Sequence, residues 1–347
     1  MRSRRDRLPA LIAALLVLAA SSGCARDDGG ATGASSGPEF AAPADRRLRI
    51  VTTVAPLTSI VANVAGDVAA VTGLVPEGAN SHTFEPPPSA ARALARADVV
   101  FLNGLGLEVP TKELAEENRA RGSEMVELGD RTISPAEYIF DFSFPESGGK
   151  PNPHLWTNPP MAKQYARLVA DTLARRDPAH GEAFEANYRR FASEVDELDR
   201  AMIAATASLP PERRNLLTYH DAYAYFARHY GWTVIGAIQP SSFEEPTSRE
   251  VADLITQIRQ QPVPAIFGSE VFPSPVLAQI GRETGVRYVD VLRDDDLPGR
   301  PGDPEHSWLG LMRFNFLTMV RSLGGDASAL ESLHLEDAAS DLTGYPK

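Results

Sequence analysis

The chain has 347 residues, of which 43% are hydrophobic and 23% are charged, and its formal net charge is −12 at pH 7. A chain of this size can bury more than one hydrophobic core, and its acidic balance argues against nucleic acid and against a polybasic membrane patch as partners. The single cysteine, Cys24, excludes an intramolecular disulfide.

The N-terminal segment has the pattern of an export signal. Residues 1–23 carry four arginines and one aspartate, and the apolar run at residues 8–20 is too short to span a bilayer. Small residues precede Cys24, as in the lipobox of bacterial lipoproteins, although Ser21 stands where that motif usually has leucine. We therefore expect Cys24 to be lipidated and to become the mature N-terminus. The alternative is a plain cleavable signal with an incidental cysteine.

Residues 24–47 are rich in Gly, Ala, Ser, Asp and Pro and predict a flexible tether. The stretch that follows, residues 48–175, alternates short β-type runs with amphipathic helical runs. This alternation is typical of a parallel sheet covered by helices, and it predicts a first lobe. The strands are expected at residues 48–54, 68–76, 98–103 and 124–128.

A long helical stretch follows, over residues 181–209. Its apolar side chains recur at spacings of three or four, and nearly thirty helical residues would extend about 40 Å. We expect residues 176–209 to be a rigid connector between two lobes. The apolar series is Phe184, Tyr188, Phe191, Val195, Leu198 and Met202.

The alternation resumes over residues 210–325 and predicts a second lobe, followed by a polar tail at residues 326–347. Its strands are expected at residues 215–220, 233–239, 265–270 and 287–292. The predicted fold class is α/β, with two β-α lobes that contain parallel-type central sheets and are joined by one long rigid helix. No segment after the signal has eighteen consecutive apolar residues, so the body is not expected to span a membrane.

Four potential metal ligands fall at strand ends or in the loops after them: His82, His154, His220 and Asp290. Ligands of open parallel sheets bind beyond the carboxyl ends of the strands, so these residues could converge in a crevice between the lobes. Three imidazoles and one carboxylate suit a tetrahedral Zn²⁺ site, whereas Mn²⁺ prefers more oxygen ligands. Four protein ligands would close the coordination shell, which argues against catalysis.

Each of these residues also has an ordinary interpretation. His82 and His154 could be exposed loop residues, His220 could cap a helix, and Asp290 could cap a turn. The remaining histidines are expected to have no role at the site: His180, His229, His306 and His334.

The same segments resemble the metal-binding receptors of bacterial zinc and manganese ABC importers, the cluster A-I solute-binding proteins that include adhesin lipoproteins. The resemblance extends over residues 48–323. Its motifs are N-S-H-T-F-E-P at residues 80–86, N-P-H-L-W-T-N-P at 152–159, Y-H-D-A-Y-A-Y-F at 219–226 and Y-V-D-V-L at 288–292, supported by N-G-L-G-L-E at 103–108, E-P-T at 245–247 and A-I-F-G-S-E at 265–270.

The resemblance implies that the four family ligands fall on His82, His154, His220 and Asp290, and that Glu270 is a second-shell or alternate oxygen ligand. His220 is the subtype marker, since manganese receptors commonly have Glu there and zinc receptors commonly have His. The chain departs from the family at Asn80 and Asn158, where Asp is frequent. It also departs at residues 130–152, which contain no histidine and thus no histidine-rich loop.

We therefore expect a monomeric, lipid-anchored, extracytoplasmic receptor that captures Zn²⁺ and delivers it to an ABC permease and its ATPase. Capture requires neutral imidazoles, so affinity should fall below about pH 6.5. A manganese receptor of the same family is the first alternative. The others are a zinc hydrolase with Glu270 as the general base, and an adhesin that uses the metal only for stability.

Overall fold

The computed structural model describes residues 47–239, 246–260, 263–269, 275–338 and 344–345. The chain divides into two units, Met1–Arg46 and Arg47–Lys347. The predicted signal peptide and Cys24 therefore lie outside the described residues, as do Glu270 and all but the last residue of the predicted tether.

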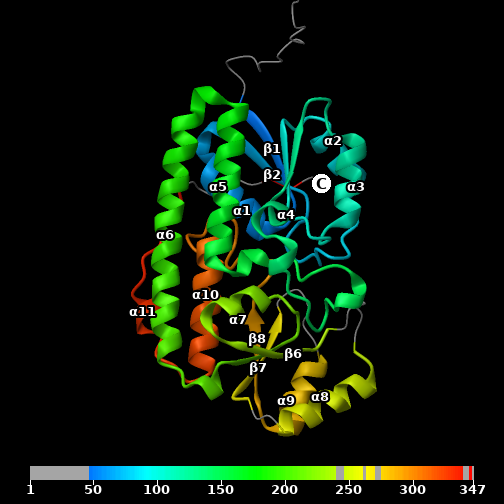
Figure 1. Cartoon of the computed structure of the whole chain (residues 1–347), viewed down its shortest axis with the longest axis vertical. Helices are drawn as coiled ribbons and strands as arrows, with labels where there is room; N and C mark the ends of the chain where they lie inside the picture. Colours follow the sequence, from blue (N-terminus) through cyan, green and yellow to red (C-terminus); the bar gives the residue numbers. More distant parts are fainter. Residues whose placement is uncertain (1–46, 240–245, 261–262, 270–274, 339–343, 346–347) are drawn as a thin grey trace, which may run out of the picture. The chain divides into compact units, whose positions relative to one another are not determined.

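The first lobe of the second unit contains a parallel sheet with the strand order β2-β1-β3-β4 among the described residues (Figure 1). The strands are β1 Leu48–Thr52, β2 Ala69–Gly73, β3 Val99–Leu102 and β4 Glu124–Glu127. The α-helices are α1 Ala55–Ala65, α2 Pro88–Leu94, α3 Val109–Asn118, α4 Leu128–Thr132 and α5 Pro159–Arg176.

Both faces of this sheet are buried, as expected for a parallel sheet between helices. Along β3, Val99 and Phe101 face the main core, which α1, α5 and α6 complete, whereas Val100 and Leu102 face a smaller core under α2 and α3. This strand is therefore apolar at every position rather than alternating.

The second lobe repeats the arrangement with the described strand order β6-β5-β7-β8, again parallel. Helices α8 and α9 cover one face, and α7 and α10 lie on the other (Figure 1). The strands are β5 Asn215–Thr218, β6 Thr233–Ala237, β7 Ala265–Ser269 and β8 Arg287–Leu292. The α-helices are α7 Ala224–Tyr230, α8 Ser248–Gln260, α9 Pro275–Thr284, α10 Trp308–Ser322 and α11 Ser328–Glu331.

A long helix, α6 (Gly181–Ala207), links the lobes and packs along α5, α1, α10 and α11 (Figure 1). The inner face of α6 buries the apolar side chains whose spacing the sequence analysis noted, namely Phe184, Phe191, Val195, Leu198 and Met202. This apolar stripe is the surface of the helix that packs on the core. One continuous hydrophobic core contains these side chains together with residues of both sheets. The prediction of two parallel-sheet lobes joined by a long helix is confirmed.

The C-terminal segment, residues 326–347, was expected to be a polar tail, but part of it packs on the body. Leu330 is buried on α11, and Leu333 packs against the main core. Gly344 forms a parallel bridge with Thr72, at the edge strand β2 of the first sheet. Because apolar residues recur within this segment, its helix adds to the core.

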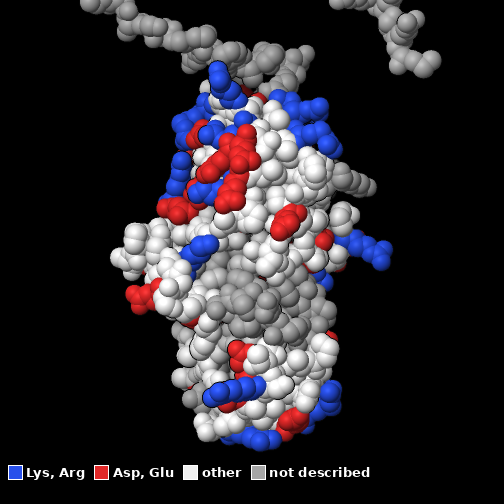
Figure 2. All heavy atoms as spheres, turned by 90° about the vertical axis from the view of Figure 1, so that its right-hand side faces the viewer, with Lys and Arg blue, Asp and Glu red and all other residues white. Residues whose placement is uncertain are grey.

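Short 3-10 turns complete the described backbone: Gly66–Val68, Pro135–Glu137, Glu146–Gly148, Leu155–Thr157, Pro178–His180 and Pro211–Arg213. No helix in the described segments combines the length and the apolar character that crossing a bilayer requires. On the face drawn in Figure 2, the described Lys and Arg side chains are interspersed with Asp and Glu.

Candidate metal centre

His82 lies on the loop between β2 and α2, beyond the carboxyl end of β2. The side chain of Asn80 accepts a hydrogen bond from the backbone N–H of His82 at 2.9 Å. This local turn is a common role for asparagine, and it fixes the backbone that carries the imidazole. His82 is half-buried.

His154 lies on the proline-flanked segment that precedes α5, and it is completely buried. Asn152 forms two hydrogen bonds with His154. Its Oδ1 accepts one from the backbone N–H of His154 at 3.1 Å and one from the Nδ1–H of the ring at 2.8 Å. The second bond keeps the proton of a neutral ring on Nδ1, so Nε2 presents its lone pair.

His220 follows β5 in the second lobe and is also buried. Its Nδ1–H donates to Oε1 of Gln239 at 2.5 Å, and Gln239 lies just after the neighbouring strand β6. The same tautomer results, with the Nε2 lone pair directed into the interior.

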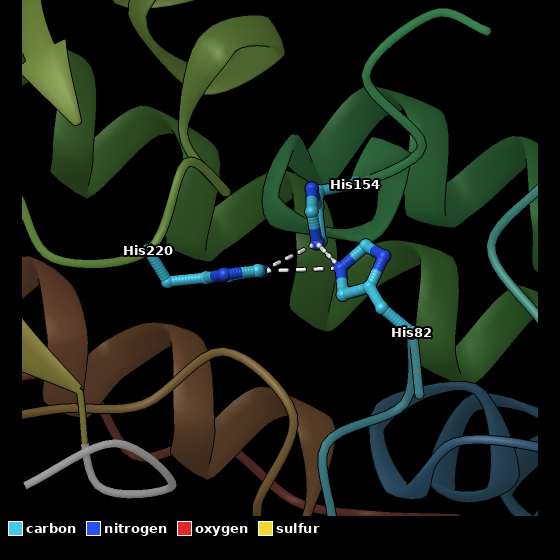
Figure 3. Close-up of side chains that lie close together, drawn as sticks. All are labelled: His82, His154 and His220. Carbon is cyan, nitrogen blue, oxygen red and sulfur yellow. Dashed lines mark hydrogen bonds between the residues drawn. The ribbon is translucent and has the colours of Figure 1, made fainter. Parts of the chain in front are cut away.

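The three imidazoles converge on one point, as Figure 3 shows. The Nε2–Nε2 distances are 3.2 Å for His82–His154, 3.3 Å for His82–His220 and 2.9 Å for His154–His220. A zinc ion bound tetrahedrally at 2.0–2.1 Å would hold such nitrogens about 3.4 Å apart, only slightly further than observed. Among the described residues, these three histidines are the group that offers ligand atoms to one metal ion.

The fourth predicted ligand, Asp290, is not part of this group. Its side chain is exposed on β8, which continues for two more residues to Leu292, and its neighbour Val289 is buried. The pairing of β7 with β8 is irregular here, and Val289 and Leu292 enter the main core while Asp290 between them stays exposed. Parallel strands present ligands beyond their carboxyl ends, and a residue inside the strand does not reach the crevice.

The carboxylates that do lie in the crevice come directly after β8. Asp294 is buried, and its Oδ2 lies 3.4 Å from Nε2 of His220. Asp295 is buried as well, and its Oδ2 accepts from Oγ of Ser81, the residue before His82, at 2.7 Å. Asp290 thus lies four and five residues before the two carboxylates that the structure buries beside the histidine cluster.

Burial lowers the pKa of His82 and of His154 well below 6.5, and the neighbouring imidazoles lower both further. Burial raises the pKa of the Asp295 carboxyl, while the nearby His220 acts in the opposite direction. The neutral form of His82 and His154 is thus favoured, and neutral imidazole is the form that binds a metal ion.

A cavity of about 540 Å³ connects this centre with the surface on the side of His82. Its wall includes Phe144, Ser143, Lys150 and Pro153 besides His82. His154 and His220 are buried behind it, so His82 stands at the solvent side of the cluster.

Sequence reasoning did not find several supporting residues. Asn80 and Asn152 each precede a histidine by two positions, and that shared N-x-H spacing is a signal that could have suggested them as holders of the histidine backbone. Gln239, Asp294 and Asp295 carry no such local signal, because their partners are distant in the sequence. Glu270, the predicted second-shell residue, lies outside the described residues.

The family model for the zinc-uptake complex component A, periplasmic (ZnuA), matches residues 50–322. The chain belongs to this family. It is thus a metal-binding receptor of an ABC importer and not a member of an enzyme family, which confirms the resemblance drawn from the sequence motifs.

Individual relatives carry the names of different metals. The manganese-binding lipoprotein MntA of Halalkalibacterium halodurans is 28% identical over 309 residues, which cover 89% of this chain and 96% of MntA. The iron-binding protein YfeA of Yersinia pestis is 27% identical, with coverage of 80% and 87%. The zinc-binding protein TroA of Treponema pallidum is 28% identical, with coverage of 81% and 91%.

The solved structure of periplasmic TroA superposes on this chain with a TM-score of 0.72 at 27% identity, covering 80% of this chain and 99% of TroA. The same two-lobed fold therefore belongs to both proteins.

Proposed function

We propose that this receptor captures Zn²⁺ outside the cytoplasmic membrane and delivers it to an ABC permease and its ATPase. One observation carries the proposal: three imidazole Nε2 atoms converge at 2.9–3.3 Å. Two of the rings have their tautomer set by a side-chain amide. Three neutral nitrogens and one carboxylate form a ligand set suited to tetrahedral zinc. Asp295 replaces Asp290 as the carboxylate in this proposal.

The names of the relatives leave the metal open, because they include manganese, iron and zinc. Manganese is the second candidate, and a specific feature favours it. Two buried carboxylates, Asp294 and Asp295, follow β8, and Mn²⁺ takes more oxygen ligands than Zn²⁺.

Elemental analysis of the purified full chain, followed by competition titration at neutral pH, distinguishes the two metals. The zinc proposal predicts about one zinc per chain and tighter binding of Zn²⁺ than of Mn²⁺. Equal or tighter binding of Mn²⁺ would exclude it. Growth of a deletion strain in chelated medium, restored by added zinc, separates uptake from an adhesin role.

We also propose that Cys24 carries the lipid anchor and that the receptor is a monomer. Membrane fractionation of cells that express the wild type or Cys24→Ser tests the anchor. The wild type should sediment with membranes, and the variant should be released or remain unprocessed. A soluble wild type would contradict the anchor, and a dimer in sedimentation analysis would contradict the monomer.

A further inference from the structure

The loop that carries His82 begins in the first lobe but is held by the second. Leu74 and Val75 donate their backbone N–H groups to the carbonyls of Thr52 and Thr53, where β1 ends, at 3.0 and 3.2 Å. Beyond Val75, the backbone hydrogen bonds from this loop to other segments of the described chain end on carboxylates of the second lobe. The loop therefore lies against the lobe to which it does not belong.

Two aspartates after β8 form these hydrogen bonds. Oδ1 of Asp296 accepts from the backbone N–H of Gly78 at 2.7 Å. Oδ2 of Asp295 accepts from the backbone N–H of Ser81 at 3.2 Å and from Oγ of the same residue at 2.7 Å. Both contacts join the middle of the loop to the second lobe.

A third contact at the start of the loop is the ion pair between Glu77 and His306. Oε1 of Glu77 lies 3.0 Å from Nε2 of His306, and the two side chains are 28% and 2% exposed. The other ring nitrogen, Nδ1, faces the carbonyl oxygen of Pro298 at 3.1 Å. A neutral imidazole has one N–H, so only the doubly protonated ring can donate to both oxygens. The arrangement therefore makes His306 an imidazolium.

The surroundings of His306 favour its positive charge. A cavity of about 390 Å³ opens beside the ring, and its described lining contains Asp303, Glu336 and Asp337 but no Lys or Arg. Nearby carboxylates favour the charged form of an imidazole and offset the cost of its burial. Oε1 of Glu77 is buried and accepts no hydrogen bond from any other described group, so the imidazolium supplies its compensating charge.

His306 stands on a rigid base. The next residue, Ser307, caps the N-terminus of α10 with its side chain. Trp308, the first residue of the helix, is completely buried, and its backbone N–H donates to Oγ of Ser59 on α1 at 2.8 Å. The start of α10 is thus fixed to the first lobe as well as to the second, and a contact with His306 restrains whatever it holds.

We propose that His306 is a positioning residue of the metal centre, whose imidazolium binds Glu77, holds the loop of His82 against the second lobe and so slows release of the bound ion. The inference rests on the proposed function, because it concerns retention of the same metal. His82 stands at the solvent side of the cluster, so the ion leaves when this loop moves away from His154 and His220. Without the ion pair the loop moves away more often, whereas the two buried histidines that first meet an incoming ion stay in place.

The test compares the full chain loaded with Zn²⁺ as wild type, His306→Gln, Glu77→Gln and the double variant. Release of Zn²⁺ to an excess of a chromophoric chelator is followed by absorbance, and capture is measured by mixing metal-free protein with Zn²⁺. Each single variant should release Zn²⁺ about tenfold faster and capture it within about twofold of the wild-type rate. The double variant should be no faster than the single ones, because both substitutions break the same contact.

His229→Gln is the matched control. It breaks another histidine–carboxylate pair, which joins α7 to α6 through Asp199 at 2.8 Å, and it should change neither rate. Glu77 is half-buried on a loop, so Glu77→Gln tests the contact even where His306→Gln fails to fold. Equal acceleration of release in His229→Gln would show that the effect is a general loss of stability and would overturn the proposal.

Nitrogen NMR of the zinc-loaded protein, labelled with ¹⁵N at histidine, reads the charge of the ring directly. At about pH 7 both nitrogens of His306 should have the chemical shifts of an imidazolium, and Glu77→Gln should move them toward those of the neutral ring. A neutral ring in the wild type, or unchanged release from His306→Gln and Glu77→Gln, overturns the role of His306 and leaves the zinc receptor intact. A wild type that does not bind Zn²⁺ overturns the proposed function itself.

Discussion

The side chains that surround the three histidines orient the imidazole rings. Asn152 from the first lobe and Gln239 from the second each accept an Nδ1–H, so the Nε2 atoms of His154 and His220 are left as electron-pair donors. Such outer-shell amides orient imidazoles and tune their basicity. Residues that never touch the metal are therefore expected to control affinity.

Replacement of one of these amides should weaken metal binding without removing a ligand. Gln239→Ala deletes the acceptor for His220, frees the ring to rotate and to change tautomer, and should weaken Zn²⁺ binding about 10- to 100-fold. Competition titration measures the loss. Gln279→Ala is the control, because Gln279 is exposed and donates a hydrogen bond to an exposed glutamate of its own helix, α9. Unchanged zinc affinity in Gln239→Ala would show that the amide does not support the site.

The buried imidazole of His154, by its own contribution, should destabilise the metal-free protein in mild acid. The folded-state pKa of His154 lies below the unfolded value of 6.5, so the unfolded chain binds more protons as the pH falls. The contribution of His154 to the free energy of unfolding should therefore start to fall near pH 6.5 and continue to fall toward its folded pKa, opposite in direction to the contribution of Glu108. Denaturant titrations at several pH values between about 5 and 8 measure this slope.

Relative to the wild type, His154→Gln should gain stability as the pH falls over the same range, because the variant has no buried imidazole to protonate. Equal slopes would contradict the prediction. For metal binding, the depressed pKa values of His82 and His154 move the expected loss of affinity to a lower pH than the 6.5 inferred from the sequence.

At the scale of elements, the loops at the strand ends are fixed by buried polar side chains. Glu108 precedes α3, and its carboxyl group accepts hydrogen bonds from Oγ1 of Thr53 and from the backbone N–H groups of Asn103 and Gly104. The Asn103 side chain in turn donates to the carbonyl of Pro153, next to His154. The start of one helix is therefore connected to the loop that carries His154.

Glu108 should make stability depend on pH near neutrality. Burial raises its pKa to about 7, despite hydrogen bonds that act in the opposite direction, and the unfolded value is 4.5. The folded state therefore binds more protons between these values, and stability falls as the pH rises from about 4.5 through about 7. Compared with Glu108→Gln, the wild type should lose up to about 3 kcal/mol of unfolding free energy across this range.

Chemical denaturation of both proteins at about pH 5 and pH 8 provides the measurement. Glu117→Gln, on the exposed side of the same helix, is the control and should follow the wild type. Parallel pH profiles for wild type and Glu108→Gln would mean that Glu108 keeps one protonation state throughout.

At the scale of the second unit, the two lobes share one hydrophobic core. Helix α6 packs on helices of both lobes, and Phe191 contacts Trp308 of α10 with ring centroids 5.5 Å apart. Trp308 donates its Nε1–H to the carbonyl of Trp156, and Trp156 donates its own Nε1–H to the carbonyl of Asp294. These contacts oppose a wide hinge motion, because opening the lobes would expose buried aromatic side chains.

The body should accordingly unfold in one cooperative transition. Bound metal should raise the midpoint temperature of this transition. With zinc at about 100 times its dissociation constant, the stabilisation is about 3 kcal/mol, and a chelator should remove it. Differential scanning calorimetry with and without zinc measures both effects. Two separate transitions in the metal-free protein would show that each lobe folds independently.

The repeating patterns of the sequence determined most of the fold. The apolar β-type runs and the helical periodicity of α6 are local signals, and the three histidines stand at or just after predicted strand ends, so the two lobes and these histidines could be identified without coordinates. Leu330 near the C-terminus is a weaker signal, because it stands within a polar segment that predicts a tail, whereas the structure buries it.

Only the tertiary structure decided which groups complete the site. Asp290, Asp294, Asp295 and Asp296 are chemically alike and lie within seven positions of one another. Their roles depend on where β8 ends and which way each side chain turns. Gln239 likewise meets His220 only because β5 and β6 pair. Periodicity specifies the faces of each element, but the ligand set depends on contacts between segments that are distant in the chain.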